Sequence, residues 1–159
     1  MAESDQSGSS NPDSKKRTGR VVPILVIVVL LGVVPIFFMT SSDIEGSLRT
    51  SGHLGDTAFV PVSCESGQAL GFFGVELSSE SQPGRRIRLL RDAIKGSIVT
   101  VEVAGASQPL AVFSSADCRL IDVNVRKTNT IVNSIYVVEG QASIECPGLV
   151  GTVRFGGCH

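Results

Sequence analysis

The stretch RLIDVNVRKTNTIVNSIYVVEGQASIECPGLVGTVRF, residues 119–155, contains three successive runs in which apolar and polar residues alternate. In the first run, the apolar members are Ile121, Val123 and Val125. A repeat of two places such side chains on one face of a strand, so each run predicts a β-strand. Turn signals at residues 127–130 and at Pro147-Gly148 separate the runs. The stretch therefore predicts a three-stranded antiparallel meander.

The same alternation recurs upstream in shorter runs, beginning near residue 57. In the first of these runs we expect Val60, Val62 and Cys64 to share the buried face. A turn signal at residues 82–85 predicts a β-hairpin between two later runs. No convincing amphipathic helix interrupts the pattern. We therefore predict an all-β domain, either an antiparallel β-sandwich or a small barrel of about eight short strands.

Residues 21–39, VVPILVIVVLLGVVPIFFM, contain no charged side chain. As a helix this segment would be about 28 Å long, close to the thickness of the hydrocarbon core of a bilayer. Basic residues precede it and acidic residues follow it at Asp43 and Glu45, so the positive-inside rule places the N-terminus in the cytoplasm. The basic residues are Lys15, Lys16, Arg17 and Arg20.

A cleaved signal peptide is the alternative interpretation of this apolar segment. We favour an uncleaved signal anchor, because the apolar core exceeds the roughly 7–15 residues of a signal peptide and Thr40-Ser41-Ser42 is a poor cleavage site. The predicted organisation is a disordered cytoplasmic tail at residues 1–20 and a transmembrane helix at 21–40. A linker with a candidate first strand follows at 41–56, and an extracytoplasmic β-domain at 57–159.

All four cysteines, Cys64, Cys118, Cys146 and Cys158, follow the apolar segment. Outside the cytoplasm an even number of cysteines predicts disulfides. A zinc site is the rival interpretation, but the close Cys-x-x-Cys or His-x-x-His pairs that it needs do not occur. Three disulfide pairings are open. A turn at residues 127–130 would put Cys118 beside Cys158, and Cys64 and Cys146 lie on core faces, so we favour Cys64–Cys146 and Cys118–Cys158.

The sequence offers no constellation of catalytic, cofactor-binding or metal-binding residues. His53 and His159 are the only histidines, and neither has a positioned partner in sequence, so we expect solvated loop histidines rather than a general base or a metal ligand. Ser63 and the Ser114-Ser115 pair lie outside any Gly-x-Ser-x-Gly motif. A formal net charge of −1 gives no basic excess for binding nucleic acid. We expect no cofactor and no enzymatic activity.

One local cluster of charge is formed by Arg85, Arg86, Arg88 and Arg91. On a hairpin arm, Arg86 and Arg88 would share the face opposite Ile87 and Leu89. Such a stripe is a candidate anion-binding site for an acidic envelope polymer or lipid headgroups. The alternative, which we favour, is a solvated strand face whose charges discourage edge-to-edge pairing with another chain.

The segments EGQASIEC (residues 139–146) and GTVRFGGC (residues 151–158) resemble small bacterial envelope β-domains of uncharacterised function, which are periplasmic and lipoprotein-like. Such domains often end in a Gly-x-Val-x-Phe strand that leads to a final cysteine. The resemblance implies a location in the cell envelope and no known activity. This chain departs from it because no lipidation cysteine lies in or just after the apolar segment.

Together these observations predict a single-pass protein of the bacterial inner membrane with a periplasmic or extracellular C-terminal domain. We expect that domain to be a non-catalytic interaction or structural module, whose partner is an envelope protein or an anionic polymer. A binding protein for an anionic or small envelope ligand is the second hypothesis, and an enzyme of unknown class is the third.

Overall fold

The computed structural model describes residues 42–159, which form one compact unit. The predicted tail at residues 1–20 and the predicted transmembrane helix at 21–40 lie outside the described residues. Within residues 42–159, no helix is long and apolar enough to cross a membrane. The two helices described are single 3₁₀ turns, η2 (Gly52–Leu54) and η3 (Gly67–Leu70).

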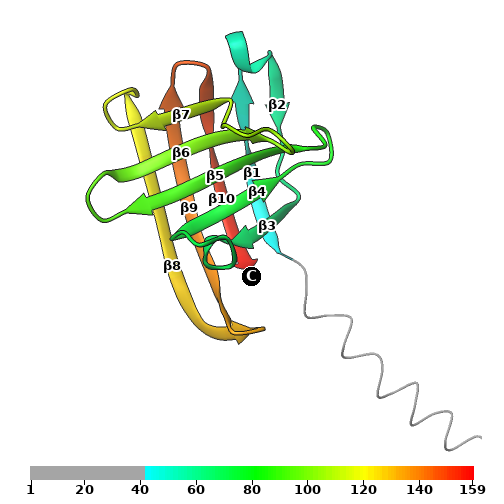
Figure 1. Cartoon of the computed structure of the whole chain (residues 1–159), viewed down its shortest axis with the longest axis vertical. Helices are drawn as coiled ribbons and strands as arrows, with labels where there is room; N and C mark the ends of the chain where they lie inside the picture. The colour runs from blue at the N-terminus through cyan, green and yellow to red at the C-terminus, as the bar shows by residue number, and fades with distance from the viewer. Residues whose placement is uncertain (1–41) are drawn as a thin grey trace, which may run out of the picture. The chain divides into compact units, whose positions relative to one another are not determined.

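Within residues 42–159, ten antiparallel strands form two five-stranded sheets, which we call sheet A and sheet B (Figure 1). Sheet A has the order β2-β1-β10-β9-β8, with β1 (Asp43–Thr50), β2 (Thr57–Phe59), β8 (Leu120–Val132), β9 (Ile135–Cys146) and β10 (Leu149–Cys158). Sheet B has the order β3-β4-β5-β6-β7, with β3 (Ser63–Ser66), β4 (Gly74–Ser78), β5 (Arg85–Asp92), β6 (Gly96–Val103) and β7 (Ala111–Ser114). The predicted all-β class is confirmed, and the two separate sheets make the domain a sandwich with ten strands rather than about eight.

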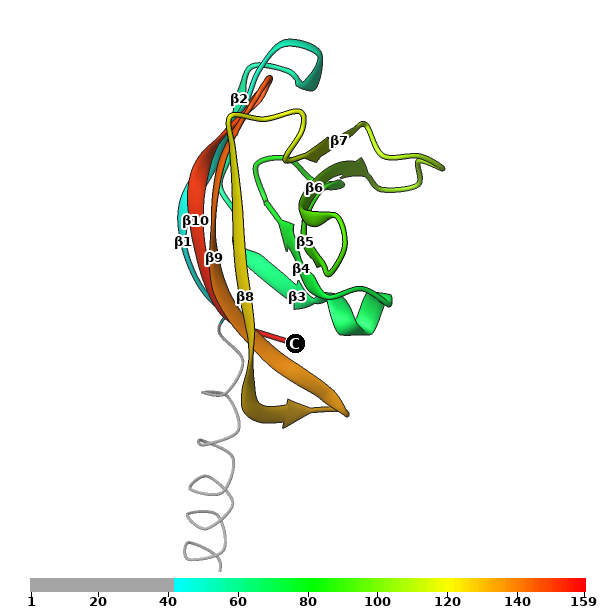
Figure 2. The same cartoon turned by 90° about the vertical axis from the view of Figure 1, so that its left-hand side faces the viewer.

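The core fills the space between the two sheets, which face each other with their strands crossing (Figures 1 and 2). It consists of aliphatic and aromatic side chains at alternate strand positions. Those with no exposed surface include Leu48, Phe59, Val75, Leu77, Ile87, Leu89, Val99, Val101, Val123, Leu149 and Val153. The alternation read from the sequence therefore identifies the buried face of most strands correctly.

The first upstream run is an exception. Val60 and Val62 are 48% and 47% exposed, whereas Phe59 is buried, so the expectation is wrong for these two valines, although Cys64 is buried as expected. Phe59 ends β2 in sheet A, and β3 begins at Ser63 in sheet B. The chain crosses from sheet A to sheet B between Phe59 and Ser63. The alternation of inward and outward side chains therefore does not continue from one strand into the next.

Residues 43–50, expected as part of a linker with a candidate first strand, form the complete strand β1. β1 lies between β2 and β10, and its register with β10 runs from Asp43 opposite Gly156 to Thr50 opposite Leu149. β1 therefore belongs to the same sheet as strands from the segment 57–159.

The predicted meander of β8, β9 and β10 is present, but its first turn lies later than expected. β8 continues through residues 127–130, where its register with β9 shifts, and the chain turns at Asn133 and Ser134. Both turn residues have positive φ, +50° and +66°, as a two-residue type I′ hairpin requires. The polar residues 127–130, which resemble a turn in the sequence, therefore lie at an irregularity within the strand.

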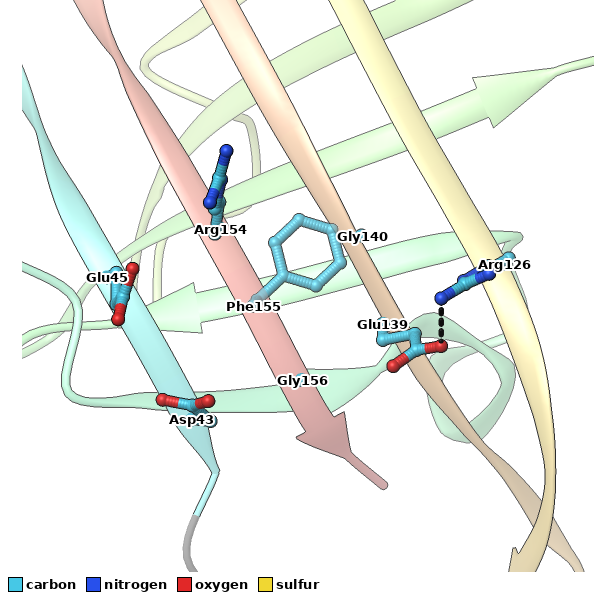
Figure 3. A pocket seen from close by; sticks show the side chains of 8 residues that line it. All are labelled: Asp43, Glu45, Arg126, Glu139, Gly140, Arg154, Phe155 and Gly156. Carbon is cyan, nitrogen blue, oxygen red and sulfur yellow. Dashed lines mark ion pairs between the residues drawn. The ribbon is translucent and has the colours of Figure 1, made fainter.

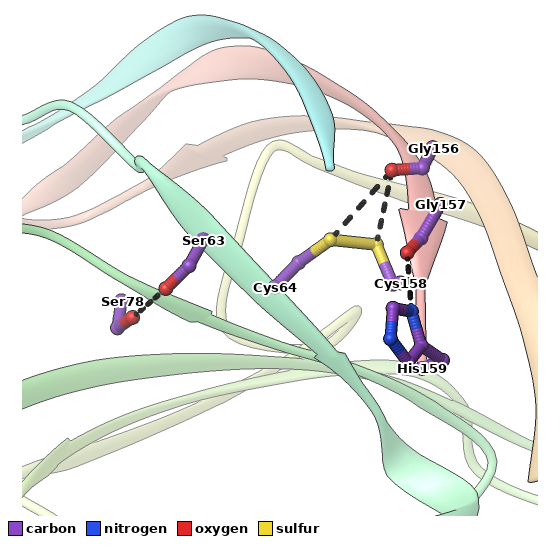
Figure 4. Close-up of a disulfide and its surroundings, with 7 residues drawn as sticks. All are labelled: Ser63, Cys64, Ser78, Gly156, Gly157, Cys158 and His159. Atoms are coloured by element: carbon purple, nitrogen blue, oxygen red, sulfur yellow. Dashed lines mark hydrogen bonds between the residues drawn. A yellow bond between two sulfur atoms is a disulfide. The ribbon is translucent and has the colours of Figure 1, made fainter. Parts of the chain in front are cut away.

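All four cysteines form disulfides, as predicted, but the favoured pairing is wrong. The bonds are Cys64–Cys158 and Cys118–Cys146, with Cα atoms 5.1 Å and 4.3 Å apart. The misplaced turn explains the error: with the turn at Asn133, the start of β8 lies beside the end of β9, and the backbone N–H of Arg119 donates to the carbonyl oxygen of Glu145. Cys118 consequently reaches Cys146, and Cys158 bonds across the sandwich to Cys64 of sheet B (Figure 4).

Candidate functional site

The predicted arginine stripe divides between the two faces of β5. Arg86 and Arg88 project from the outer face of sheet B, opposite the buried Ile87 and Leu89, as the alternation predicts. Arg85 lies beside Gln82 and Val103, and the Arg91 guanidinium donates a 3.2 Å hydrogen bond to the carbonyl oxygen of Val123 in sheet A. The four arginines therefore do not line one surface.

On the outer face of sheet B, Arg86 and Arg88 both bind Glu76. Nη1 of Arg86 and Nε of Arg88 each lie 2.7 Å from a different Glu76 carboxylate oxygen, and the Glu76 side chain is only 4% exposed. Nη1 of Arg88 lies 2.9 Å from Oε1 of Glu102. Two carboxylates thus balance two guanidinium groups, so this face offers an anion little uncompensated positive charge.

A second group of charged residues surrounds a shallow hollow of about 400 Å³ on sheet A (Figure 3). Strand register assembles it: Glu45 of β1 lies opposite Arg154 of β10, and Glu139 of β9 lies opposite Arg126 of β8. Asp43 completes the charged set, and Gly140, Phe155 and Gly156 complete the lining. The hollow therefore presents three carboxylates and two guanidinium groups, and no local pattern in the sequence indicates it.

The charges of this hollow differ in how they are paired. Arg126 and Glu139 form an ion pair of 2.8 Å, in which Arg126 is 75% exposed. Within residues 42–159, Asp43, Glu45 and Arg154 form no ion pair. The carboxylate oxygens of Asp43 and Glu45 can accept hydrogen bonds from hydroxyl or ammonium groups. The guanidinium group of Arg154 can donate to carbonyl, carboxylate or phosphate oxygens. This combination suits a polar partner carrying both donors and acceptors.

The two histidines lie far apart. His53 belongs to η2, beside the start of β10, whereas His159 follows the last residue of β10, where its Nδ1 lies 2.9 Å from the carbonyl oxygen of Gly157 (Figure 4). They do not form a joint metal or proton-transfer site. Among residues 42–159, no group of three or more His, Cys, Asp or Glu side chains could hold a metal ion.

Two carboxyl groups with lowered pKa values stabilise turns outside these surfaces. The pKa of Asp92 is lowered because its carboxylate accepts hydrogen bonds from the backbone N–H groups of Lys95 and Ile94 in the β5–β6 turn. The pKa of Asp117 is lowered chiefly by the hydroxyl of Ser114, which lies at the end of β7. Both groups are solvent-exposed turn caps, and their pKa shifts have this local cause.

Comparison with known protein families, with characterised proteins and with solved structures finds no match to this chain. The two disulfides indicate an oxidising compartment outside the cytoplasm, because reducing systems keep cytosolic thiols free. The function of the domain is therefore inferred from the charged and apolar side chains on its surface.

Proposed function

We propose that this chain is a single-pass inner-membrane protein whose C-terminal sandwich is a non-catalytic interaction module of the bacterial envelope. Residues 21–39 act as the uncleaved anchor, with the N-terminus in the cytoplasm. The disulfides, the apolar segment with its preceding basic residues and the likeness to small envelope β-domains support this assignment.

The charged hollow on sheet A carries the interaction part of the proposal. Asp43, Glu45 and Arg154 project from adjacent central strands of a sheet that a disulfide ties to its partner sheet. A rigid base of this kind fixes the spacing of donors and acceptors before a partner arrives, which reduces the entropy cost of binding. The partner that matches is a polar protein segment carrying at least one cation for the two carboxylates.

A second candidate is a binding protein for a small anionic ligand. Arg154 and Arg126 at the same hollow favour it, since guanidinium groups bind carboxylate and phosphate oxygens. Asp43 and Glu45 oppose it, because two carboxylates beside the ligand would repel its charge. We therefore rank the protein partner first.

Anchoring is tested on the full chain in its own membrane. The protein should resist extraction by alkaline carbonate and keep its N-terminal tail, while protease added outside spheroplasts digests the sandwich. A mature chain beginning near Asp43 would instead identify residues 21–39 as a cleaved signal peptide, and a protected sandwich would reverse the orientation.

Partner binding is tested by placing a photo-crosslinking amino acid at Glu45 in intact cells, with the same substitution at exposed Val112 of sheet B as the matched control. A discrete protein adduct should form from position 45 and not from position 112. Arg154→Ser should remove that adduct, whereas Arg119→Ser, at an exposed ion pair distant from the hollow, should leave it. Equal adducts from both positions, or none, would contradict the proposal, and adduct loss on adding free phosphate would favour the small-anion candidate.

A further inference from the structure

The β8–β9 hairpin extends beyond the other strands of sheet A. β10 ends at Cys158 opposite Val138, but β8 and β9 continue to pair through Ile131 and Tyr136 before the turn. Figure 2 shows this tip projecting past the end of β10, at the same end of the domain where β1 begins. The tip therefore forms the outermost surface at the end where the chain enters the sandwich.

Exposed apolar side chains collect on this tip and on the adjoining segment around η3. We call them, with Lys127, the hairpin-end cluster: Leu70, Phe73, Lys127, Ile131 and Tyr136. Leu70 and Phe73 are each 41% exposed, Ile131 is 55% exposed and Tyr136 is 38% exposed. Phe73 and Tyr136 are the two aromatic residues among the exposed large hydrophobic side chains of residues 42–159. The cluster leaves in water the kind of surface that folding normally buries.

Contacts hold the two parts of the cluster together. Oε1 of Gln68 accepts a 3.2 Å hydrogen bond from the backbone N–H of Tyr136, and Nε2 of Gln68 donates to the carbonyl oxygen of Ser134 at 3.5 Å. Nζ of Lys127 lies 4.9 Å from the centre of the Tyr136 ring and 6.0 Å from that of Phe73. The cluster is thus a preformed surface, joined across the turn of one sheet and a loop of the other.

The two segments that form the cluster, residues 67–74 and 127–138, carry very little charge. Residues 67–74 contain no charged residue, and residues 127–138 contain only Lys127. Lys127 is therefore the one charge that these two segments themselves carry, and a lysine can extend its ammonium group toward headgroups while its methylenes remain apolar. Tyrosine, lysine and aliphatic side chains together are typical of the membrane–water interface.

The length of chain between the apolar segment and β1 limits how far this surface can lie from the proposed anchor. Asp43 begins β1 at the same end of the domain, and the apolar segment ends at Met39, so the connecting chain can span at most about 14 Å. If residues 21–39 anchor the chain, the membrane surface lies within that distance of Asp43, so the bilayer is the nearest surface available to the cluster. We propose, resting on the anchoring proposed above, that the hairpin-end cluster inserts into the interfacial layer of the membrane that holds the anchor. This contact fixes the orientation of the sandwich and holds sheet A at a set angle to the membrane.

The test uses the full chain in vesicles of phosphatidylcholine and phosphatidylglycerol, prepared with and without brominated acyl chains. The natural sequence contains no tryptophan, so Ile131→Trp introduces a single reporter into the cluster. Val150→Trp is the matched control: Val150 is 51% exposed on the same sheet, but it pairs with Glu145, about 30 Å along β9 from Tyr136. Brominated lipid should quench the Ile131→Trp fluorescence and leave that of Val150→Trp unchanged.

Further readouts make each outcome decisive. Blue-shifted emission of Ile131→Trp without quenching would mean that protein, such as a second copy of the chain, covers the cluster, and this would overturn the inference. Unshifted emission like that of Val150→Trp would overturn it as well, provided that the variant has no free thiols. Should Ile131→Trp expose thiols, Leu70→Trp serves as the reporter under the same criteria. Release of both variants from vesicles by alkaline carbonate would refute the anchoring itself, whereas failure of quenching alone leaves the proposed function standing.

Discussion

Among single residues, Glu76 is unusual because it is a charged side chain buried on the outer face of a sheet. The guanidinium groups of Arg86 and Arg88 cover it and supply two hydrogen bonds of 2.7 Å. We predict that Glu76→Gln lowers the free energy of unfolding by about 1–3 kcal/mol. A neutral amide cannot balance the two cations, and with a single acceptor oxygen it leaves one guanidinium group without its hydrogen-bond acceptor. Urea denaturation at neutral pH measures this change.

Glu139 provides the control for that prediction, since its ion-pair partner Arg126 is mostly exposed to solvent. Glu139→Gln should change the unfolding free energy by less than about 0.5 kcal/mol, as is usual for exposed pairs. Equal effects of the two substitutions would show that the Glu76 pairs contribute no more than a surface salt bridge.

At the scale of strands, Gly140 allows β9 to approach both its neighbour and the core. A Cβ atom at this position would collide with the backbone oxygen of Asn124 in β8 and lie 3.1 Å from Cζ of Phe155. We predict that Gly140→Ala lowers the free energy of unfolding by about 1–3 kcal/mol, because the backbone oxygen cannot move aside without disturbing the sheet. Thermal or urea denaturation followed by circular dichroism would measure the loss.

Gly156→Ala is the matched control on the adjacent strand. A Cβ atom at Gly156 would have its nearest neighbour at 3.9 Å, an ordinary van der Waals distance. The substitution should therefore remain within about 0.5 kcal/mol of the natural protein. A loss at Gly156 as large as that at Gly140 would mean that close approach to the backbone of Asn124 does not determine the effect.

Strands were easier to predict than the connections between them. Alternation depends on neighbouring residues, so it identified Ile87, Leu89 and Val123 as inward-facing. The turn at Asn133 was missed because the polar residues 127–130 resemble a turn, while pairing with β9 over many residues keeps them in a strand. Asparagine tolerates positive φ, and the Asn-Ser pair between two apolar runs was the available signal.

The charged hollow could not be predicted from any local pattern. Glu45 and Arg154 are more than a hundred positions apart in sequence, and only the pairing of β1 with β10 brings them together. The arginine stripe, in contrast, rests on a local pattern, which carries no information about the side chains of neighbouring strands. Alternation placed Arg86 and Arg88 on one face, but nothing nearby indicated that Glu76 and Glu102 would neutralise them.

At the scale of the whole domain, the two disulfides have different tasks. Cys118–Cys146 joins the start of β8 to the end of β9 within sheet A, whereas Cys64–Cys158 joins sheet B to sheet A. Their sequence separations are 28 and 94 residues, so the second bond closes a much longer loop in the unfolded chain. Because a longer loop restricts more conformations, the bond between the sheets should contribute more to stability.

We therefore predict that the double variant Cys64→Ala/Cys158→Ala loses about 1 kcal/mol more unfolding free energy than Cys118→Ala/Cys146→Ala, from loop-closure entropy alone. Urea denaturation of both variants measures the difference, and peptide mapping without reduction checks that the remaining bond is native in each. Loss of the bond between the sheets should also make amide exchange faster in β3, at the edge of sheet B, than in β9. The opposite order of stabilities would show that strain or contacts in the folded state outweigh loop entropy, and that the bond within sheet A holds the sandwich together.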